Sequence, residues 1–249
     1  MTMSEDWKER TLLQCGPDGV RLLSEARVAV VGLGGVGAMA AEMVARAGVG
    51  KMIIADADSY SITNKNRQIA AFDSTLGRKK TSVVSSRLKD INPDIQIEAI
   101  DQFLSEENIP SVLPLLDGQG KPQVDYVIDA IDTLSPKIAL IKFCMDNRIP
   151  LVSSMGAGAK WDATRVRLAD ISKSFNCPLA YMLRKRLRKI GISKGFKVVF
   201  SEELPVKEAI VPFEEQNKKS RTGTISYLPA VFGCICAQAA ITWILKLEG

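Results

Sequence analysis

Histidine is absent from all 249 residues of this chain, and cysteine occurs only five times. Without an imidazole, neither a Ser-His-Asp triad nor a Cys-His pair can take a proton from a nucleophile. Any acid–base chemistry must therefore use carboxylates, lysine, arginine or the substrate itself. The sequence also contains no C-x-x-C pair, so the usual zinc ligand sets are excluded together with histidine-based catalysis.

The five cysteines are odd in number and widely scattered, which argues against a disulfide framework and favours reduced thiols in the cytoplasm. Cys234 and Cys236 fall in an apolar terminal segment and are most simply core residues. The N-terminus lacks the apolar core of a signal peptide. Pro229 and several polar residues interrupt the candidate membrane span at residues 228–247, so we expect a buried helix and no membrane insertion.

Hydrophobic residues make up 46% of the chain, which is enough for a large core in one principal domain. The net charge of +5 is modest for a protein that binds nucleic acid. The placement of the charges is therefore more informative than their sum.

Apolar runs at residues 27–31, 52–55, 95–100, 124–131 and 151–153 predict strands, separated by predicted helices at 38–47, 79–91 and 135–147. Strands that alternate with helices require right-handed crossovers and a mostly parallel sheet. The predicted fold class is α/β, a doubly wound Rossmann-like domain at residues 27–158 that follows a polar N-terminal arm at residues 1–26.

Beyond residue 158 the pattern changes. Strand-like runs at 166–168 and 197–200 flank a basic helix at 179–190, a polar loop that contains proline extends through residues 217–221, and an apolar helix closes the chain. We interpret residues 159–249 as an appended α/β half of the same domain that covers the carboxyl ends of the strands.

The sequence GLGGVG at residues 32–37 satisfies the G-x-G-x-x-G pattern immediately after a predicted strand and at the start of a predicted helix. In that context a nucleotide phosphate can bind to backbone N–H groups at the helix N-terminus. Asp56 ends the second strand and is placed to accept a hydrogen bond from a ribose hydroxyl. These features suit a dinucleotide dehydrogenase as well as an ATP enzyme. The glycines of the turn are Gly32, Gly34, Gly35 and Gly37.

Amides and cations cluster just beyond the ribose position and favour a triphosphate. A dinucleotide site neutralises its pyrophosphate largely with the helix N-terminus, whereas a triphosphate needs additional polar groups. Lys80 alone could equally be a solvated lysine on a helix face, but its combination with Asn64 and Arg67 indicates phosphate binding. The candidate cluster consists of Asp58, Asn64, Asn66, Arg67 and Lys80.

Two aspartates follow the fourth predicted strand, where ligands bind in open α/β sheets. Asp132 offers a hard oxygen ligand for Mg²⁺ on the phosphates, and Asp129 is the alternative in that role. Asp132 could instead cap the helix that starts near Ser135.

The motifs GLGGVG, DADSYSITNKNRQ, GRKK, INP and DAID occur here in an order and spacing that resemble the ATP-binding half of ubiquitin-activating-like enzymes. Within that superfamily the chain resembles most closely the tRNA threonylcarbamoyladenosine dehydratase branch. The resemblance extends through residues 148–189 and so covers most of the chain. The resemblance implies that residues 27–158 form the ATP-binding domain and that residues 159–249 face the substrate and tRNA.

The resemblance implies a role for each matching residue. The glycines of the 32–37 turn would contact phosphate, Asp56 would bind the ribose, and Asp132 would hold Mg²⁺. Asn64, Arg67 and Lys80 would bind the triphosphate and stabilise the departing pyrophosphate. Arg10 matches an arginine that reaches into the partner subunit's site, which implies a homodimer, although it could also be a surface residue on a mobile arm.

The same branch adenylylates the threonyl carboxylate of threonylcarbamoyladenosine beside the tRNA anticodon, and the carbamoyl group then closes a ring. A basic stretch in the predicted helix at 179–190 would contact the tRNA backbone. A charge run is more often a solvated helix face, and these side chains cannot all point one way. The stretch consists of Arg184, Lys185, Arg186, Arg188 and Lys189.

Departures from the superfamily pattern leave alternatives. Relatives that activate sulfur-carrier proteins generally carry paired C-x-x-C motifs, which this chain lacks, so adenylylation of a carrier's C-terminus is the alternative activity. Residues 221–227 contain no cysteine, although some dehydratases have one there. An NAD-dependent oxidoreductase and an inactive nucleotide-binding scaffold also remain open, as does a partner protein for sulfur transfer.

Overall fold

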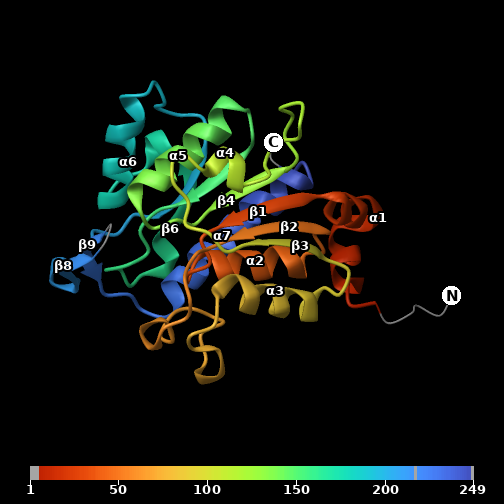
Figure 1. Ribbon diagram of the computed structural model, residues 1–249, viewed down its shortest axis with the longest axis horizontal. Helices are drawn as coiled ribbons and strands as arrows, with labels where there is room; N and C mark the ends of the chain where they lie inside the picture. The colour runs from red at the N-terminus through yellow and green to blue at the C-terminus, as the bar shows by residue number, and fades with distance from the viewer. Residues whose placement is uncertain (1–5, 216–217, 248–249) are drawn as a thin grey trace.

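The computed structural model describes residues 6–215 and 218–247, and its central feature is a seven-stranded sheet in the order β3-β2-β1-β4-β5-β7-β6 (Figure 1). Neighbouring strands are parallel except at the edge, where β6 runs antiparallel to β7. This confirms the predicted fold class. The strands are β1 Arg27–Val31, β2 Lys51–Ala55, β3 Gln96–Ile100, β4 Tyr126–Asp129, β5 Leu151–Ser154, β6 Val166–Asp170 and β7 Lys197–Ser201.

Helices cover both faces of the sheet, which explains why its central strands are apolar at nearly every position. Val28 and Val30 pack into one core cluster, whereas Ala29 and Val31 point to the other face and pack into a second cluster. The first cluster includes residues of α2 Gly37–Arg46, α3 Lys80–Ile91 and α7 Tyr227–Ile244. The second includes residues of α4 Ile109–Val112, α5 Leu134–Asp146 and α6 Pro178–Arg188.

The N-terminal segment at residues 1–26, for which the sequence predicts no secondary structure, contains a helix, α1 Glu9–Glu25. Gly16 has φ of 71° and ψ of 176° and kinks this helix before Pro17. A Gly-Pro pair normally ends a helix, because glycine favours that backbone conformation and proline cannot donate a hydrogen bond. The pair hid the helical pattern from the sequence.

The second half of the chain extends the sheet. Strand β7 pairs with β5 in parallel, β6 pairs with β7, and α6 packs beside α5. The expected loop at residues 217–221 was wrong, because β8 Ile210–Glu215 and β9 Lys218–Thr222 form an antiparallel hairpin, with residue 217 outside the described residues. Pro212 obscured this hairpin, since proline usually argues against a strand.

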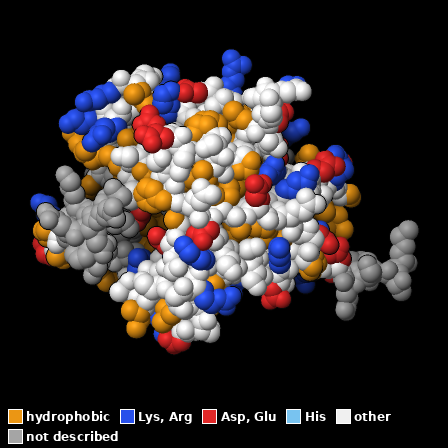
Figure 2. Space-filling view, in the orientation of Figure 1, with side chains coloured by type: hydrophobic (Ala, Val, Ile, Leu, Met, Phe, Trp, Pro, Cys, Tyr) orange, Lys and Arg blue, Asp and Glu red, His pale blue; other side chains and the backbone are white. Residues whose placement is uncertain are grey.

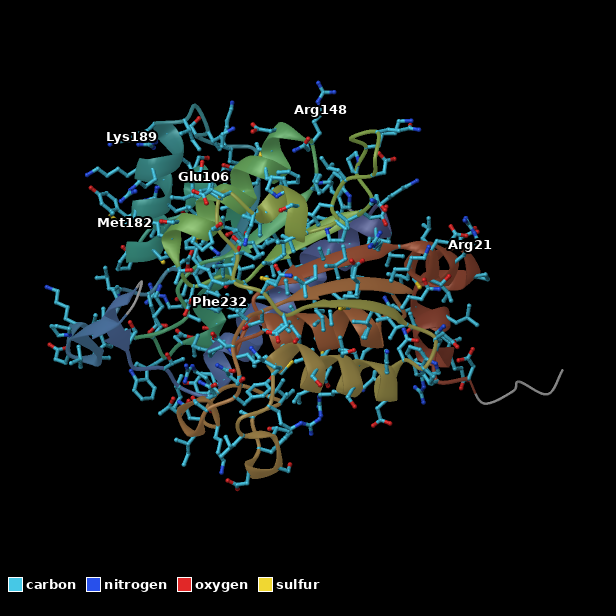
Figure 3. The ribbon with its side chains drawn as sticks, in the orientation of Figure 1. Arg21, Glu106, Arg148, Met182, Lys189 and Phe232 are labelled. Carbon is cyan, nitrogen blue, oxygen red and sulfur yellow. The ribbon has the colours of Figure 1, made fainter. Side chains whose placement is uncertain are left out.

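The C-terminal helix α7 has a mean hydropathy of 1.6 over 18 residues and is long and apolar enough, by length and composition, to span a bilayer. Its packing gives another reason for this apolarity. Phe232 is fully buried inside the molecule (Figure 3), and a Cβ on Gly233 would lie only 2.5 Å from the carbonyl oxygen of Val36, the N-cap of α2. One face of α7 therefore belongs to the protein core. Cys236 lies on it as expected, whereas Cys234 is exposed, so the expectation of a core residue is wrong for Cys234.

Candidate functional site

The glycine turn connects β1 to α2 and leaves no room for side chains at three of its positions, Gly32, Gly35 and Gly37. Gly32 has φ of +89°, and a Cβ there would lie 2.7 Å from the Ala130 carbonyl oxygen. A Cβ on Gly37 would lie 1.7 Å from the Gly32 carbonyl oxygen. In contrast, the nearest atom to a Cβ on Gly34 would be Gln68 Nε2, at 3.9 Å. The turn is closely packed beneath and open above Gly34, as expected for a backbone cradle for phosphate.

Asp56 lies beside this turn and holds it in place. Its Oδ2 accepts a hydrogen bond from the Leu33 N–H at 2.6 Å, and its Oδ1 accepts one from the Asp58 N–H at 2.8 Å. Burial raises the pKa of the Asp56 carboxyl above its ordinary value, although the positive charge of Lys80 opposes this shift. The carboxylate lies next to the first residues of the turn, where a ribose hydroxyl could reach it.

Lys80 begins α3, and its side chain is only 6% exposed, so the interpretation of a solvated lysine is wrong. Its Nζ lies 2.7 Å from Asp58 Oδ2 and 3.5 Å from Asp56 Oδ2. The Lys80 N–H also donates to the Asp58 carbonyl. A buried ammonium is thereby fixed beside the glycine turn.

The segment between β2 and α3 contains the predicted amide and guanidinium groups. Asn64 Oδ1 accepts a hydrogen bond from the Ser61 N–H, so this side chain stabilises its own turn. Asn66 Nδ2 donates to the Thr224 carbonyl at 2.9 Å and ties the segment to the chain before α7. Arg67 Nη1 donates to the Thr63 carbonyl and to Asn66 Oδ1. Both asparagines thus order the segment that presents Arg67.

Asp132 lies in the turn between β4 and α5, where its side chain is exposed. The N-cap of α5 is Thr133, so Asp132 does not cap that helix. Burial lowers the pKa of the Arg67 guanidinium, and the negative charge of Asp132 opposes this shift. Arg67 and Asp132 are therefore close enough to interact electrostatically at the carboxyl edge of the sheet.

The prediction of Asp129 as an alternative metal ligand is wrong. Asp129 and Lys137 are both fully buried and form an ion pair at 2.8 Å. Ser153 Oγ donates to the same carboxylate oxygen at 2.6 Å. The other oxygen accepts the Ile131 N–H, and Lys137 Nζ donates to the Ile131 carbonyl. This network holds the turn that leads to Asp132. Sequence reasoning missed Lys137, since lysine in a helix is usually solvated.

Gln68 directly follows Arg67, and the sequence pattern predicts no role for it. Its side chain is buried, its Nε2 faces Gly34, and within the described part of the chain its Oε1 has no hydrogen-bond partner. The amide nitrogen is the nearest atom to the open position above Gly34, so it can donate a hydrogen bond to an oxygen bound on the turn. Its position directly after Arg67 was the available signal.

The structure does not bring Arg10 to this site. Arg10 is exposed on α1, and α1 leads through Ala26 into the first residue of β1. Helix α1 lies at the right of Figure 1, and Lys8, just before Arg10, lies 3.8 Å from where a Cβ on Gly48 would be, near the amino end of β2, whereas the glycine turn lies at the carboxyl edge. Arg10 is therefore placed away from this chain's own nucleotide site.

A glycine turn at a helix N-terminus, with an aspartate at the end of the next strand, defines a nucleotide-binding protein of the Rossmann-like α/β class. The ThiF family model matches residues 8–249. The chain belongs to the ThiF family.

Three known proteins define its position in the family. The chain is 40% identical to the tRNA threonylcarbamoyladenosine dehydratase of Bacillus subtilis, over 95% of this chain and 94% of that protein. A crystal structure of the Escherichia coli tRNA N6-threonylcarbamoyladenosine dehydratase in complex with ATP is similar with a TM-score of 0.86 and 33% identity over the whole of both chains. The Escherichia coli sulfur carrier protein ThiS adenylyltransferase is 32% identical over 57% of this chain and 53% of its own length.

Proposed function

We propose that this chain is an ATP-dependent tRNA threonylcarbamoyladenosine dehydratase that acts in the cytoplasm. The observation that carries the proposal is the similarity to the Bacillus subtilis dehydratase along nearly the whole chain. The site adds support, because its glycine turn, Asp56 and Lys80 suit a nucleotide with several phosphates. The amide nitrogen of Gln68, the nearest atom to a Cβ on Gly34, is a further donor beside the turn.

The chemistry activates a carboxylate. A free carboxylate is a poor electrophile, because its charge repels a nucleophile and oxide is a poor leaving group. Transfer of AMP to the threonyl carboxylate, with release of pyrophosphate, removes both obstacles. The carbamoyl group of the same substituent then attacks the acyl carbon, AMP leaves and a ring closes, with the net loss of one water. Intramolecular attack supplies much of the proximity advantage, which suits a chain without histidine.

The residues divide this work by charge. The N–H groups of the 32–37 turn bind phosphate, and the Asp56 carboxylate accepts a hydrogen bond from a ribose hydroxyl. Arg67 and Lys80 balance the charge on the departing pyrophosphate. Asp58, the present partner of Lys80, is 71% exposed, so the ammonium can exchange this weak surface pair for a phosphate oxygen.

Asp132 would hold Mg²⁺. Among the described residues no group of three or more His, Cys, Asp and Glu side chains could hold a metal. Mg²⁺ on a nucleotide commonly needs only one or two carboxylates, because phosphate oxygens and water complete its shell. An exposed carboxylate at the carboxyl edge therefore fits the ion, which would supply additional positive charge at the phosphates.

A homodimer would complete the site. Arg10 lies away from its own nucleotide site, so its catalytic role requires that the helix α1 of one subunit reach the site of the other. The basic stretch on α6 would contact tRNA phosphates. A sulfur-transfer partner protein remains part of the proposal only as a docking partner with no assigned surface.

The test is nucleoside analysis by mass spectrometry. tRNA that carries threonylcarbamoyladenosine is incubated with the protein, ATP and Mg²⁺, then digested under mild conditions. We expect the nucleoside to lose the mass of one water only when ATP is present. An unchanged nucleoside, with protein that still binds AMP, would refute the proposal. The alternative, activation of a sulfur-carrier protein, would then be supported by ATP–pyrophosphate exchange that requires the carrier and ignores tRNA.

A further inference from the structure

A hollow of about 370 Å³ lies on α6 and is lined by Tyr181, Arg184, Lys185 and Arg188. These residues are spaced by three, one and three positions, so they share one face of the helix. Arg186 falls roughly 140° around the helix from Tyr181 and does not line the hollow. Lysine and arginine side chains gather over this region at the upper left of Figure 2. We call these four residues the α6 groove.

Tyr181 gives the groove a flat aromatic wall. Its side chain is 58% exposed, so the ring is accessible to a ligand. Three cations lie on the same face of the helix. This combination of one π-face and several positive charges is the one that proteins use to bind unpaired nucleotides, in which the base stacks and the phosphates pair with the cations.

Arg184 is held in place before any ligand arrives. Its Nη1 donates to the Ser174 carbonyl at 2.7 Å and also to Ser174 Oγ. Ser174 is itself buried and donates its hydroxyl to the Ile171 carbonyl. The guanidinium therefore keeps its direction, and its other nitrogens remain as donors for a phosphate. Preorganisation of this kind reduces the entropy cost of binding.

The α6 groove begins near the carboxyl edge of the sheet and extends along α6 away from that edge. The N-cap of α6, Cys177, has its Sγ 3.7 Å from where a Cβ on Gly156 would lie, and Gly156 follows the carboxyl end of β5. Tyr181 stands in the first turn of α6, and Arg188 is its last residue. They are about 10 Å apart along the helix axis. Met182 and Lys189 mark this helix in Figure 3.

We propose that the α6 groove binds an unpaired nucleotide of the RNA substrate, with its base stacked on Tyr181 and its phosphates on Arg184, Lys185 and Arg188. This rests on the proposed function, because it assigns the part of the RNA that the second half of the chain holds. A base inside a duplex is already stacked on its neighbours, so the groove selects single-stranded RNA. An anticodon loop offers such nucleotides beside the reacting adenosine.

Binding is measured by fluorescence anisotropy with the full-length protein and a labelled single-stranded RNA of about ten nucleotides. Tyr181→Ala should weaken binding about 5- to 100-fold, whereas Tyr181→Phe, which keeps the ring, should bind as the original chain does. Arg188→Ala should reduce the slope of log K against log salt by about one, and Arg186→Ala, which removes the same charge from another face, should change it less.

Three results would overturn the inference. The first is equal binding by Tyr181→Ala and Tyr181→Phe. The second is binding of a duplex of the same sequence as tightly as the single strand, which would indicate charge alone. The third is loss of RNA binding in competition with vesicles of anionic lipid, which would assign the patch to a membrane surface. Binding of AMP by each variant verifies that it is folded, and single-stranded RNA binding without ATP-dependent loss of water would refute the proposed function while leaving the groove intact.

Discussion

Replacement of Lys137 by methionine should destabilise the protein severely. The substitution roughly preserves the volume of the side chain but removes the charge that pairs with Asp129 at 2.8 Å. Both side chains have 0% exposure, so water cannot replace the lost partner. Ser153 Oγ and the Ile131 N–H still donate to Asp129, yet neither carries a compensating charge.

The expected magnitude follows from this burial. Removal of one partner from a buried ion pair costs about 3–5 kcal/mol, because the other charge remains buried without compensation. The whole free energy of unfolding is only about 5–15 kcal/mol. For a chain of this size each kcal/mol lowers Tm by roughly 2–4 °C, so Lys137→Met should lower it by about 6–20 °C.

The matched control is the double variant Asp129→Asn with Lys137→Met. It removes both charges. The asparagine carbonyl oxygen can accept the Ile131 N–H, and its NH2 group can donate to Ser153 Oγ, so the double variant should recover most of the lost stability. Thermal unfolding of the three variants at pH 7, followed by circular dichroism, measures the effect. A Tm for Lys137→Met within 1 °C of the original chain, or a double variant less stable than the single one, would refute this reasoning.

Three further predictions concern the nucleotide site. Gly37→Ala should abolish AMP binding and destabilise the protein, because its Cβ would lie 1.7 Å from the Gly32 carbonyl oxygen, whereas Gly34→Ala should fold normally. Calorimetry measures unfolding and AMP binding of both variants, and equal stability and AMP affinity of the two would contradict this prediction. Burial raises the pKa of the Asp56 carboxyl above its ordinary value of 3.8, so AMP affinity should fall in acid with a midpoint above 3.8 that disappears in Asp56→Asn. The same shift means that this group's contribution to stability declines as pH rises from 3.8 through the raised pKa, and a titration of affinity with an ordinary midpoint would be inconsistent with it. Arg10→Ala and Arg67→Ala should each be inactive, but a mixture that exchanges subunits should regain activity at about a quarter of its sites; no recovery would count against a shared site.

The central strands were predictable from the sequence because burial on both faces leaves short apolar runs that match few other structures. The helix α1 was missed because Gly16 and Pro17 interrupt its pattern, and the β8–β9 hairpin because Pro212 argues against a strand. In both segments glycine or proline, which usually marks a turn, conceals the hydrophobic pattern of the helix or strand.

The candidate site was predictable where a motif fixes the backbone, as at Gly32, Gly37 and Asp56. It was less predictable where tertiary contacts decide the role of a side chain. Asp129 and Asp132 look alike in sequence, yet the first is buried against Lys137 and the second is exposed at the carboxyl edge. Gln68 shows the same limit, because only the fold places its amide beside Gly34.

The central claim is that the threonyl carboxylate is activated as an acyl-adenylate. The most direct test uses tRNA whose threonylcarbamoyladenosine carries ¹⁸O in that carboxylate, incubated with the protein, ATP and Mg²⁺. Ring closure on an acyl-adenylate leaves one carboxylate oxygen on the phosphate of AMP, so mass spectrometry should find AMP with a single ¹⁸O. Unlabelled AMP beside a dehydrated nucleoside, or ¹⁸O in inorganic phosphate released with ADP, would contradict the account.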